Sequence, residues 1–217
     1  MKFKLIIPAI DNNKYSNDGD LAKWGGTTLL EWKISQAKKI KNIDEIIIST
    51  NNKKIKKISE SFDLKTESRY VGKHIIDLYM SIAKKYKNYY IVWLNCTSPF
   101  VSETIINKFL TKFKNKMKFY DCAFTYYQEN EYFLINNKPV NFSLNENLKE
   151  RKNLRSLKKI TNGVSILNPQ TIIKRKQLLG SKPMFYKIDW LSSLEIKDTN
   201  SINSYESLIQ YYFSSKP

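Results

Sequence analysis

The chain has 217 residues, enough for one α/β domain with an extension and a hydrophobic core of its own. Hydrophobic residues make up 41% of it, and no apolar run approaches the length of a membrane span, so we expect no membrane association. The formal charge of +17 admits an anionic partner such as a nucleic acid. Because the lysines are spread over nearly every predicted helix, we interpret the charge as composition and expect no nucleic-acid partner.

The start of the chain does not predict a signal peptide. The basic residues MKFK precede an apolar run that Pro8 interrupts too early for a signal sequence. The two cysteines, Cys96 and Cys122, lack the C-x-x-C spacing of a metal or redox site. We therefore expect a cytoplasmic protein with reduced, buried cysteines.

Apolar runs alternate with amphipathic segments through the first part of the chain. The predicted strands are residues 4–10, 44–50, 89–95 and 121–127, and the predicted helices are residues 27–40, 51–62, 74–86 and 103–113. Ser102 stands where it can cap the last of these helices. Such repetition predicts an α/β fold of Rossmann-like type, with a mainly parallel sheet covered by helices on both faces.

The pattern changes at Glu131. A hairpin is expected to turn at Asn136-Asn137, and a basic, irregular stretch follows it. We interpret Glu131–Ile160 as an excursion from a single domain that spans residues 1–217. A strand at 161–167, a helix from Pro169, a strand at 184–188 and an amphipathic helix at 203–213 are expected to complete the domain. Asn203 and Glu206 have the spacing of a capping box for the final helix.

Ligands of open α/β sheets bind beyond the carboxyl ends of the strands. Three predicted loops lie at these strand ends: Ile10–Gly26, Ser49–Asn52 and Asn95–Phe100. The sequence therefore predicts one crevice lined by all three.

The order of these segments resembles the acylneuraminate cytidylyltransferases, the CMP-sialic acid synthetase family. The matching stretches are IIPA, GGTTLLEW, IDEIIISTNN, the SRY around Arg69, LNCTSPF, TNGVSIL and INSYESLIQYY. The resemblance implies an enzyme that joins CTP to an acidic sugar and releases pyrophosphate, with Mg²⁺ as its cofactor. It also implies a homodimer formed through an excursion such as Glu131–Ile160.

The resemblance carries candidate residues onto this sequence. The nucleotide-binding candidates are Ala9, Ile10, Lys14, Asp20 and Arg69, and the acceptor-binding candidates are Asn95, Thr97, Ser98, Arg151 and Arg155. Lys14 is also the catalytic candidate, since it alone in the first loop still matches a basic position of the family. Lys158 joins the two arginines as a possible partner for a carboxylate, although a solvated basic face explains all three equally well.

The expected phosphate and metal ligands are substituted. Ile10 occupies the family's arginine position and Gly19-Asp20 its lysine–asparagine pair, while the metal-binding aspartates fall on Ser201 and Asn203. Mg²⁺ prefers charged oxygens, so two neutral side chains are poor ligands. Asp189 or Asp198 could replace them, or both could be solvated loop carboxylates. His74, the single histidine, is interpreted as structural rather than as an acid–base group.

Two functions are left open. The protein is a divergent cytidylyltransferase with an altered magnesium site, or it is a catalytically inactive relative that binds a ligand or a partner subunit. On either hypothesis we expect the protein to bind cytidine nucleotides weakly or not at all, because the first loop has lost cations and gained carboxylates.

Overall fold

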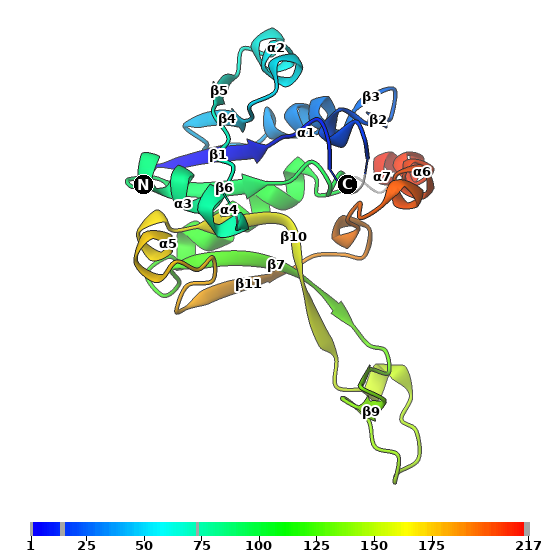
Figure 1. The fold of residues 1–217 in the computed structure, drawn as a ribbon. Helices are drawn as coiled ribbons and strands as arrows, with labels where there is room; N and C mark the ends of the chain where they lie inside the picture. Colours follow the sequence, from blue (N-terminus) through cyan, green and yellow to red (C-terminus); the bar gives the residue numbers. More distant parts are fainter. Residues whose placement is uncertain (1, 14–15, 73, 215–217) are drawn as a thin grey trace.

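The computed structural model describes residues 2–13, 16–72 and 74–214. A seven-stranded sheet of order β11-β7-β10-β6-β1-β4-β5 crosses the molecule (Figure 1). Its strands are β1 (Phe3–Pro8), β4 (Glu45–Ser49), β5 (Lys65–Glu67), β6 (Tyr90–Leu94), β7 (Cys122–Glu129), β10 (Leu157–Leu167) and β11 (Pro183–Lys187). All pairings are parallel except those of β10, which runs antiparallel to both β6 and β7. The prediction of a mainly parallel sheet is confirmed.

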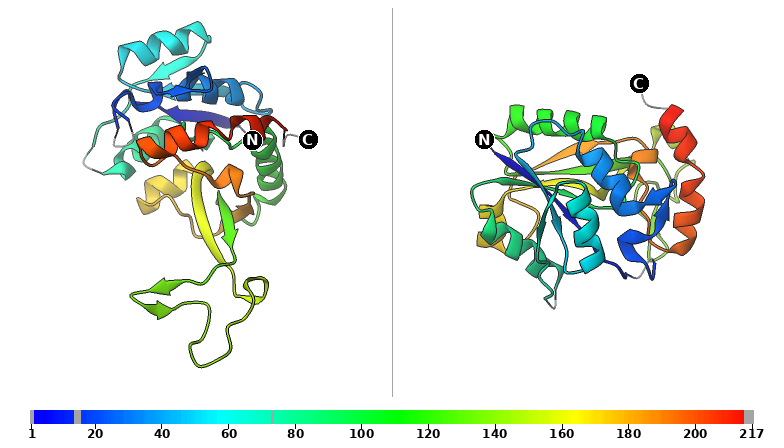
Figure 2. Two further views of the ribbon diagram at one scale, coloured as in Figure 1. Left: turned by 90° about the vertical axis from the view of Figure 1, so that its right-hand side faces the viewer. Right: turned by 90° about the horizontal axis from the view of Figure 1, so that it is seen from above.

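Helices cover both faces of this sheet, as expected (Figure 2). They are α1 (Leu29–Ala37), α2 (Lys53–Ser61), α3 (Ile75–Lys85), α4 (Glu103–Lys116), α5 (Pro169–Arg175), α6 (Thr199–Glu206) and α7 (Ile209–Ser214). Side chains of β1 alternate between two cores: Phe3, Leu5 and Ile7 pack into the core that includes α1 and α4, and Ile6 packs into the core that includes α3 and α5. This double burial explains why β1 is a continuous apolar run.

Side-chain caps set the starts of several helices. The Ser102 hydroxyl accepts a hydrogen bond from the Ile105 N–H at 3.3 Å, as predicted for α4. At the end of the sequence the prediction is wrong, because the final helix begins earlier and is divided into α6 and α7. Asp198 caps α6, accepting from the Ser201 N–H at 2.7 Å, while Asn203 lies inside the helix.

The expected hairpin at Asn136-Asn137 is present between β8 (Leu134–Ile135) and β9 (Lys138–Pro139). Both turn residues have positive φ, 49° and 62°, which suits asparagine in a two-residue hairpin loop. Strands β7 and β10 stay paired as far as Glu129 and Leu157 and carry residues 130–156 away from the body (Figure 1). Leu157–Ile160 therefore belong to β10, whose first residues leave the body together with the projecting segment (Figure 1).

One smaller expectation also has an outcome. Cys96 and Cys122 are both buried and free, as predicted. None of the helices that the structure describes is long and apolar enough to cross a membrane.

Candidate functional site

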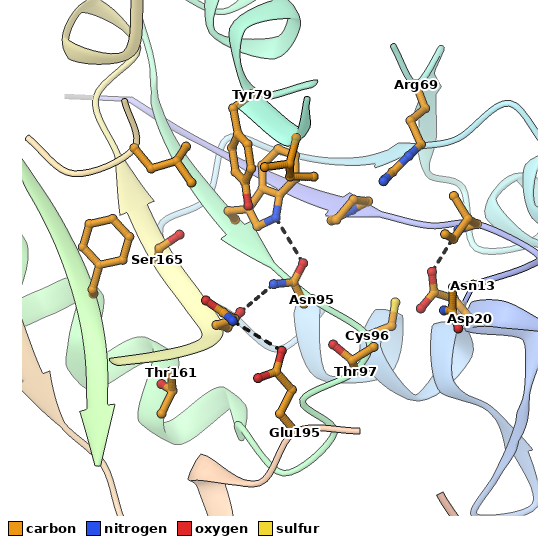
Figure 3. A pocket seen from close by; sticks show the side chains of 17 residues that line it. Asn13, Asp20, Arg69, Tyr79, Asn95, Cys96, Thr97, Thr161, Ser165 and Glu195 are labelled. Atoms are coloured by element: carbon orange, nitrogen blue, oxygen red, sulfur yellow. Dashed lines mark hydrogen bonds between the residues drawn. The ribbon is translucent and has the colours of Figure 1, made fainter. Parts of the chain in front are cut away.

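A cavity of about 470 Å³ opens beyond the carboxyl ends of β1 and β6, against the side of β10 (Figure 3). Two of the three predicted loops line it, through Ile10, Asn13 and Asp20 and through Asn95 and Thr97. The segment Ser49–Asn52 does not line the cavity, but its Asn51 contacts the backbone of Arg69, which does. α3, β10 and the segment before α6 supply walls that sequence reasoning had not placed there.

The first loop is closed by a reciprocal contact between Ile10 and Asp20. The Asp20 carboxylate accepts from the Ile10 N–H at 2.9 Å, and the Asp20 N–H donates to the Ile10 carbonyl at 2.7 Å. Gly19 makes this contact possible, because its φ is +54° and a Cβ there would lie 2.3 Å from the Ile10 carbonyl oxygen. A lysine at position 19 is therefore incompatible with this loop, whatever the resemblance implies for that position.

Asp20 is 95% buried, and burial raises the pKa of its carboxyl group to about 6, against the lowering effects of the Ile10 N–H and Arg69. Its first role is thus to shape the loop, and its second is to supply a charge that titrates near neutrality. Ala9, another nucleotide candidate, is fully buried and donates its N–H to the Ser49 carbonyl at 3.0 Å. Ala9 supports the cavity without lining it.

Arg69 is the cation that the described residues bring to the cavity wall. Asn51 clamps its backbone, donating to the Arg69 carbonyl at 2.7 Å and accepting from the Arg69 N–H at 3.0 Å. Partial burial lowers the pKa of the guanidinium and Asp20 raises it, but an arginine stays charged. Lys14, the remaining basic candidate, lies outside the described residues.

The opposite side of the cavity carries a directed series of hydrogen bonds (Figure 3). The Trp93 indole N–H donates to the Asn95 side-chain oxygen at 3.1 Å, and the Asn95 amide donates to the Asn162 carbonyl at 2.6 Å. The Asn162 amide donates to the Glu195 carboxylate at 3.5 Å. Tyr79 lies against Trp93 with ring centroids 4.1 Å apart, and burial raises the pKa of its phenol to about 12. This side of the cavity therefore has an aromatic part, Tyr79 and Trp93, and a polar part, Asn95, Asn162 and Glu195.

The turn that carries Thr97 and Ser98 is held from beneath by α1. Lys33 is fully buried, and its ammonium donates to the Ser98 carbonyl and to the Gln36 side-chain oxygen, both at 2.7 Å. Burial lowers the pKa of this amine to about 7. Thr97 lines the cavity, but Ser98 is buried under it and shapes the turn. In the sequence, the single lysine of α1 did not indicate this role.

The two arginine candidates lie in the projecting residues, away from this cavity (Figure 1). Arg151 is exposed and pairs with Glu131 at 3.2 Å. The Arg155 carbonyl accepts from the Asn141 side chain at 2.9 Å. In a single protomer, neither Arg151 nor Arg155 lines the cavity. His74 precedes α3, and its backbone N–H donates to Asp77 at 3.1 Å, in keeping with a structural interpretation.

The residues at the family's magnesium-binding positions, and their two possible replacements, make other contacts or lie on the surface. The Ser201 hydroxyl accepts from the Lys197 and Asp198 N–H groups and donates to the Asp198 carbonyl, and Asn203 is on the exposed surface of α6. Asp198 caps α6, and Asp189 accepts from the Ser192 N–H and hydroxyl. Among the described residues, no group of three or more His, Cys, Asp or Glu side chains could hold a metal. These residues do not fit a magnesium site built by the protein.

Glu195 is a candidate site residue that the sequence reasoning missed. It lines the cavity immediately before α6, the place where the resemblance puts carboxylates. The expected carboxylate positions were Ser201 and Asn203, with Asp189 and Asp198 as possible replacements, and Glu195 lies between these two aspartates in the sequence. The buried Ile196, whose N–H donates to the Thr97 carbonyl at 2.8 Å, fixes Glu195 beside the turn.

A cavity lined by both apolar and polar side chains at the strand ends of an α/β sheet is where proteins of this fold class commonly bind small molecules. The chain belongs to the cytidylyltransferase family, whose model matches residues 19–212. No functionally curated protein matched it.

Solved structures share the fold. The 4-diphosphocytidyl-2C-methyl-D-erythritol synthase of Anaerococcus prevotii DSM 20548 has a TM-score of 0.70 at 17% identity, over 96% of this chain and 98% of that one. A CMP:2-keto-3-deoxy-manno-octonic acid synthetase, solved in complex with CTP, has a TM-score of 0.72 at 11% identity, over 97% and 99%. At these identities the likeness is one of fold, and it does not single out the acylneuraminate branch.

Proposed function

We propose that the protein binds a cytidine nucleotide at the Arg69–Asp20 end of the cavity and transfers its cytidylyl group to a small acceptor at the Asn95–Glu195 end. One observation carries the proposal: a single cavity with two chemically different ends crosses the strand ends of a member of the cytidylyltransferase family. Membership of the acylneuraminate branch, with an acidic sugar as the acceptor, stays a prediction.

The proposed reaction is a displacement at phosphorus. An acceptor oxygen forms a bond to the α-phosphorus of CTP, the bond from that phosphorus to the bridging oxygen breaks, and pyrophosphate leaves with the electron pair. The acceptor hydroxyl gives its proton to the Glu195 carboxylate, which lines the acceptor end. Arg69 meets the negative charge of the nucleotide, and the net charge of +17 raises the local concentration of anions.

Ser201, Asn203, Asp189 and Asp198 do not form a magnesium site in the part of the chain that the structure describes. We propose that any Mg²⁺ in the reaction arrives bound to the triphosphate, whose oxygens commonly supply most of its non-water ligands. No step of the proposed reaction depends on a metal held by Ser201, Asn203, Asp189 or Asp198.

Calorimetric titration with CTP, with and without Mg²⁺, tests the nucleotide site. We expect weak binding, and a further loss of roughly tenfold or more in Arg69→Gln, since hydrogen bonds to charged groups contribute about 1.5–3 kcal/mol. Lys38→Gln, on an exposed lysine at the end of α1, is the control for net charge. Equal affinities of Arg69→Gln and the control would contradict the assignment.

The alternative, an inactive relative, is favoured by the loop itself, because Ile10 and Gly19 stand where the family has cations. Pyrophosphate release in the presence of CTP and a panel of acceptors separates the two functions. Binding of CTP without release of pyrophosphate across the panel would favour a ligand-binding protein over the enzyme.

A further inference from the structure

Two helices hold the turn that follows β6. This turn is Asn95–Pro99, and its first three residues line the cavity. The Trp32 indole N–H and the Gln36 side-chain amide, both from α1, donate to the Pro99 carbonyl at 2.8 Å. The Gln36 amide also donates to the Tyr212 phenol oxygen of α7 at 2.8 Å. The end of the turn is therefore fixed by a network that joins the cavity to α7.

Lys33 is the cation of this network, and its side chain is fully buried. Its ammonium donates to the Ser98 carbonyl and to the Gln36 side-chain oxygen, both at 2.7 Å, and both acceptors are uncharged. Burying an ammonium among neutral partners is costly, and an apolar side chain of similar volume would fill the same space without that cost. Packing alone therefore gives no reason for a lysine next to a turn that lines the cavity.

The groups around Lys33 allow its amine to titrate near neutral pH. Burial lowers the pKa of the amine to about 7, while Cys96 on the turn and Glu103 at the start of α4 raise it. Burial raises the pKa of the Cys96 thiol well above its usual range, and nearby Asp20 raises it further, so this thiol stays protonated. The amine is therefore charged below about pH 7 and neutral above it, whereas Asp20 changes charge near pH 6.

Loss of this proton should weaken the hold on the turn. A hydrogen bond from an ionised donor is shorter than one from a neutral donor and roughly twice as strong. The neutral amine also carries a lone pair, which cannot donate to a carbonyl oxygen. The Ser98 carbonyl is therefore held tightly while the amine is charged and more loosely once it is neutral.

We propose that Lys33 is a positioning residue of the cavity, and that its charged form holds the Asn95–Pro99 turn in the arrangement that binds the ligand. Lys33 does not line the cavity, so it acts through the turn. Cys96 of this turn lies between Glu195 and Asp20 (Figure 3), so a nucleotide that reaches the acceptor contacts the turn. The inference rests on the proposed function, because its ligand is the nucleotide of that same site.

Calorimetric titration with CTP between about pH 5 and 9 tests the role in binding, using the wild type, Lys33→Met and Lys39→Met. Lys39 is an exposed lysine just after α1, so Lys39→Met removes the same charge and is the control. The ionisation of CTP and of Asp20 affects all three proteins alike, and it cancels in the ratio of their dissociation constants. NMR of the wild type over the same pH range follows the ¹³Cε signal of Lys33 and the backbone amides of Asn95 and Thr97.

The Lys33 signal and the two turn amides should titrate with one shared midpoint near pH 7. Below that midpoint Lys33→Met should bind CTP roughly fivefold or more weakly than the wild type, because the lost hydrogen bonds are charge-assisted, and above it by a smaller factor. Lys39→Met should match the wild type throughout. Gln36→Met removes a partner of Lys33 and a donor to Pro99 without changing charge, and it should weaken CTP binding at every pH.

A weakening in Lys33→Met that is the same at every pH would show a purely structural lysine and overturn the proposal. Unchanged affinity in Gln36→Met would show that Lys33 acts by its charge alone, and would overturn it too. If the wild type binds no CTP at any pH, the proposed function fails instead, and the NMR titration decides on Lys33. The same titration decides if Lys33→Met does not fold: turn amides that do not follow the Lys33 signal overturn the positioning role.

Discussion

At the scale of single residues, the first loop shows how an acidic residue can stand in the proposed anion-binding site without repelling the anion outright. Asp20 is committed to closing the loop against Ile10, and its burial beside Arg69 brings its titration close to neutral pH. From the sequence, Asp20 is one of the carboxylates expected to repel phosphates. Because the contact joins the Asp20 carboxylate and N–H to backbone groups of Ile10 that only the folded loop brings beside them, residue type alone did not reveal it.

The raised pKa of Asp20 predicts a pH-dependent stability. The folded state binds this proton more tightly than the unfolded state, whose pKa is near 3.8, so the contribution is present at low pH and lost as pH rises through about 6. It amounts to about 3 kcal/mol at 1.36 kcal/mol per pH unit. Asp20→Asn keeps an oxygen for the Ile10 N–H, and its free energy of unfolding should therefore exceed that of the wild type increasingly between pH 4 and 7.

Urea titrations at several pH values give this difference directly, and Asp18→Asn, at an exposed site in the same loop, is the control. A difference between Asp20→Asn and the wild type that stays constant with pH would contradict the burial argument.

A second prediction concerns Gly19 and Gly26, which both have positive φ but differ in what lies near the Cβ position. Gly26 has φ +79° with open space at the Cβ position, whereas at Gly19 a Cβ would lie 2.3 Å from a backbone oxygen. Gly26→Ala should cost about 1 kcal/mol of stability, from backbone strain alone. Gly19→Ala should cost at least ~2 kcal/mol more, since the backbone at residues 10–12 must move. Unfolding in urea compares the two, and equal losses would show that the loop relaxes freely.

At the scale of elements, the ends of α6 and of the sheet position the acceptor wall. Asp198 starts α6, and this start leaves Glu195 on the preceding segment, facing the cavity. A helix that began at Asn203, as the capping-box spacing indicated, would have left this segment free to take another path.

The position of this cap can be measured. Asp198→Ala removes the acceptor for the Ser201 N–H and should lower the free energy of unfolding by about 1 kcal/mol. Asn203→Ala, inside the helix on an exposed face, should change it by no more than ~0.6 kcal/mol, in the stabilising direction. Matched denaturation curves of the two variants give the comparison; a larger loss in Asn203→Ala would place the cap where the sequence spacing put it.

Local patterns predicted the elements well and the site incompletely, for a physical reason. Apolar runs in β1 and β4, the Ser102 cap and the Asn136-Asn137 turn depend on neighbours in sequence, and each is confirmed. Lys33 under the Ser98 turn, Asn51 behind Arg69 and the Trp93–Asn95–Asn162–Glu195 series depend on contacts between segments far apart in sequence. A register carried over from a family could not supply these contacts, and the capping-box spacing put the N-cap of the last helix at Asn203, five residues after Asp198.

At the scale of the whole molecule, the projecting residues 130–156 leave large apolar side chains in solvent. Leu134 is 56% exposed, Ile135 65%, Leu144 74% and Leu148 66%. Exposed apolar patches of this kind usually mark contacts between protein molecules. The homodimer expected from Glu131–Ile160 therefore stays a prediction, now tied to these four residues.

Light scattering should give twice the monomer mass of 25.6 kDa at micromolar concentration. Ile135→Lys with Leu144→Lys should reduce the mass to that of one protomer without lowering the melting temperature of the body. Phe119→Lys, at a body residue that is 69% exposed, is the control and should leave the dimer intact. A monomeric wild type at micromolar concentration would contradict this interface.

The backbone at Gly19 also constrains how this protein can change over evolutionary time. Restoring a lysine there by itself would insert a side chain where the Ile10 carbonyl already lies, and the protein would lose its folded loop before gaining a phosphate contact. A series of single substitutions toward a strongly cationic loop therefore passes through variants that are less fit than both the present sequence and the final one. Under selection that acts on one substitution at a time, new cations are more accessible on the walls formed by α3 and β10, where added side chains meet no backbone of the first loop.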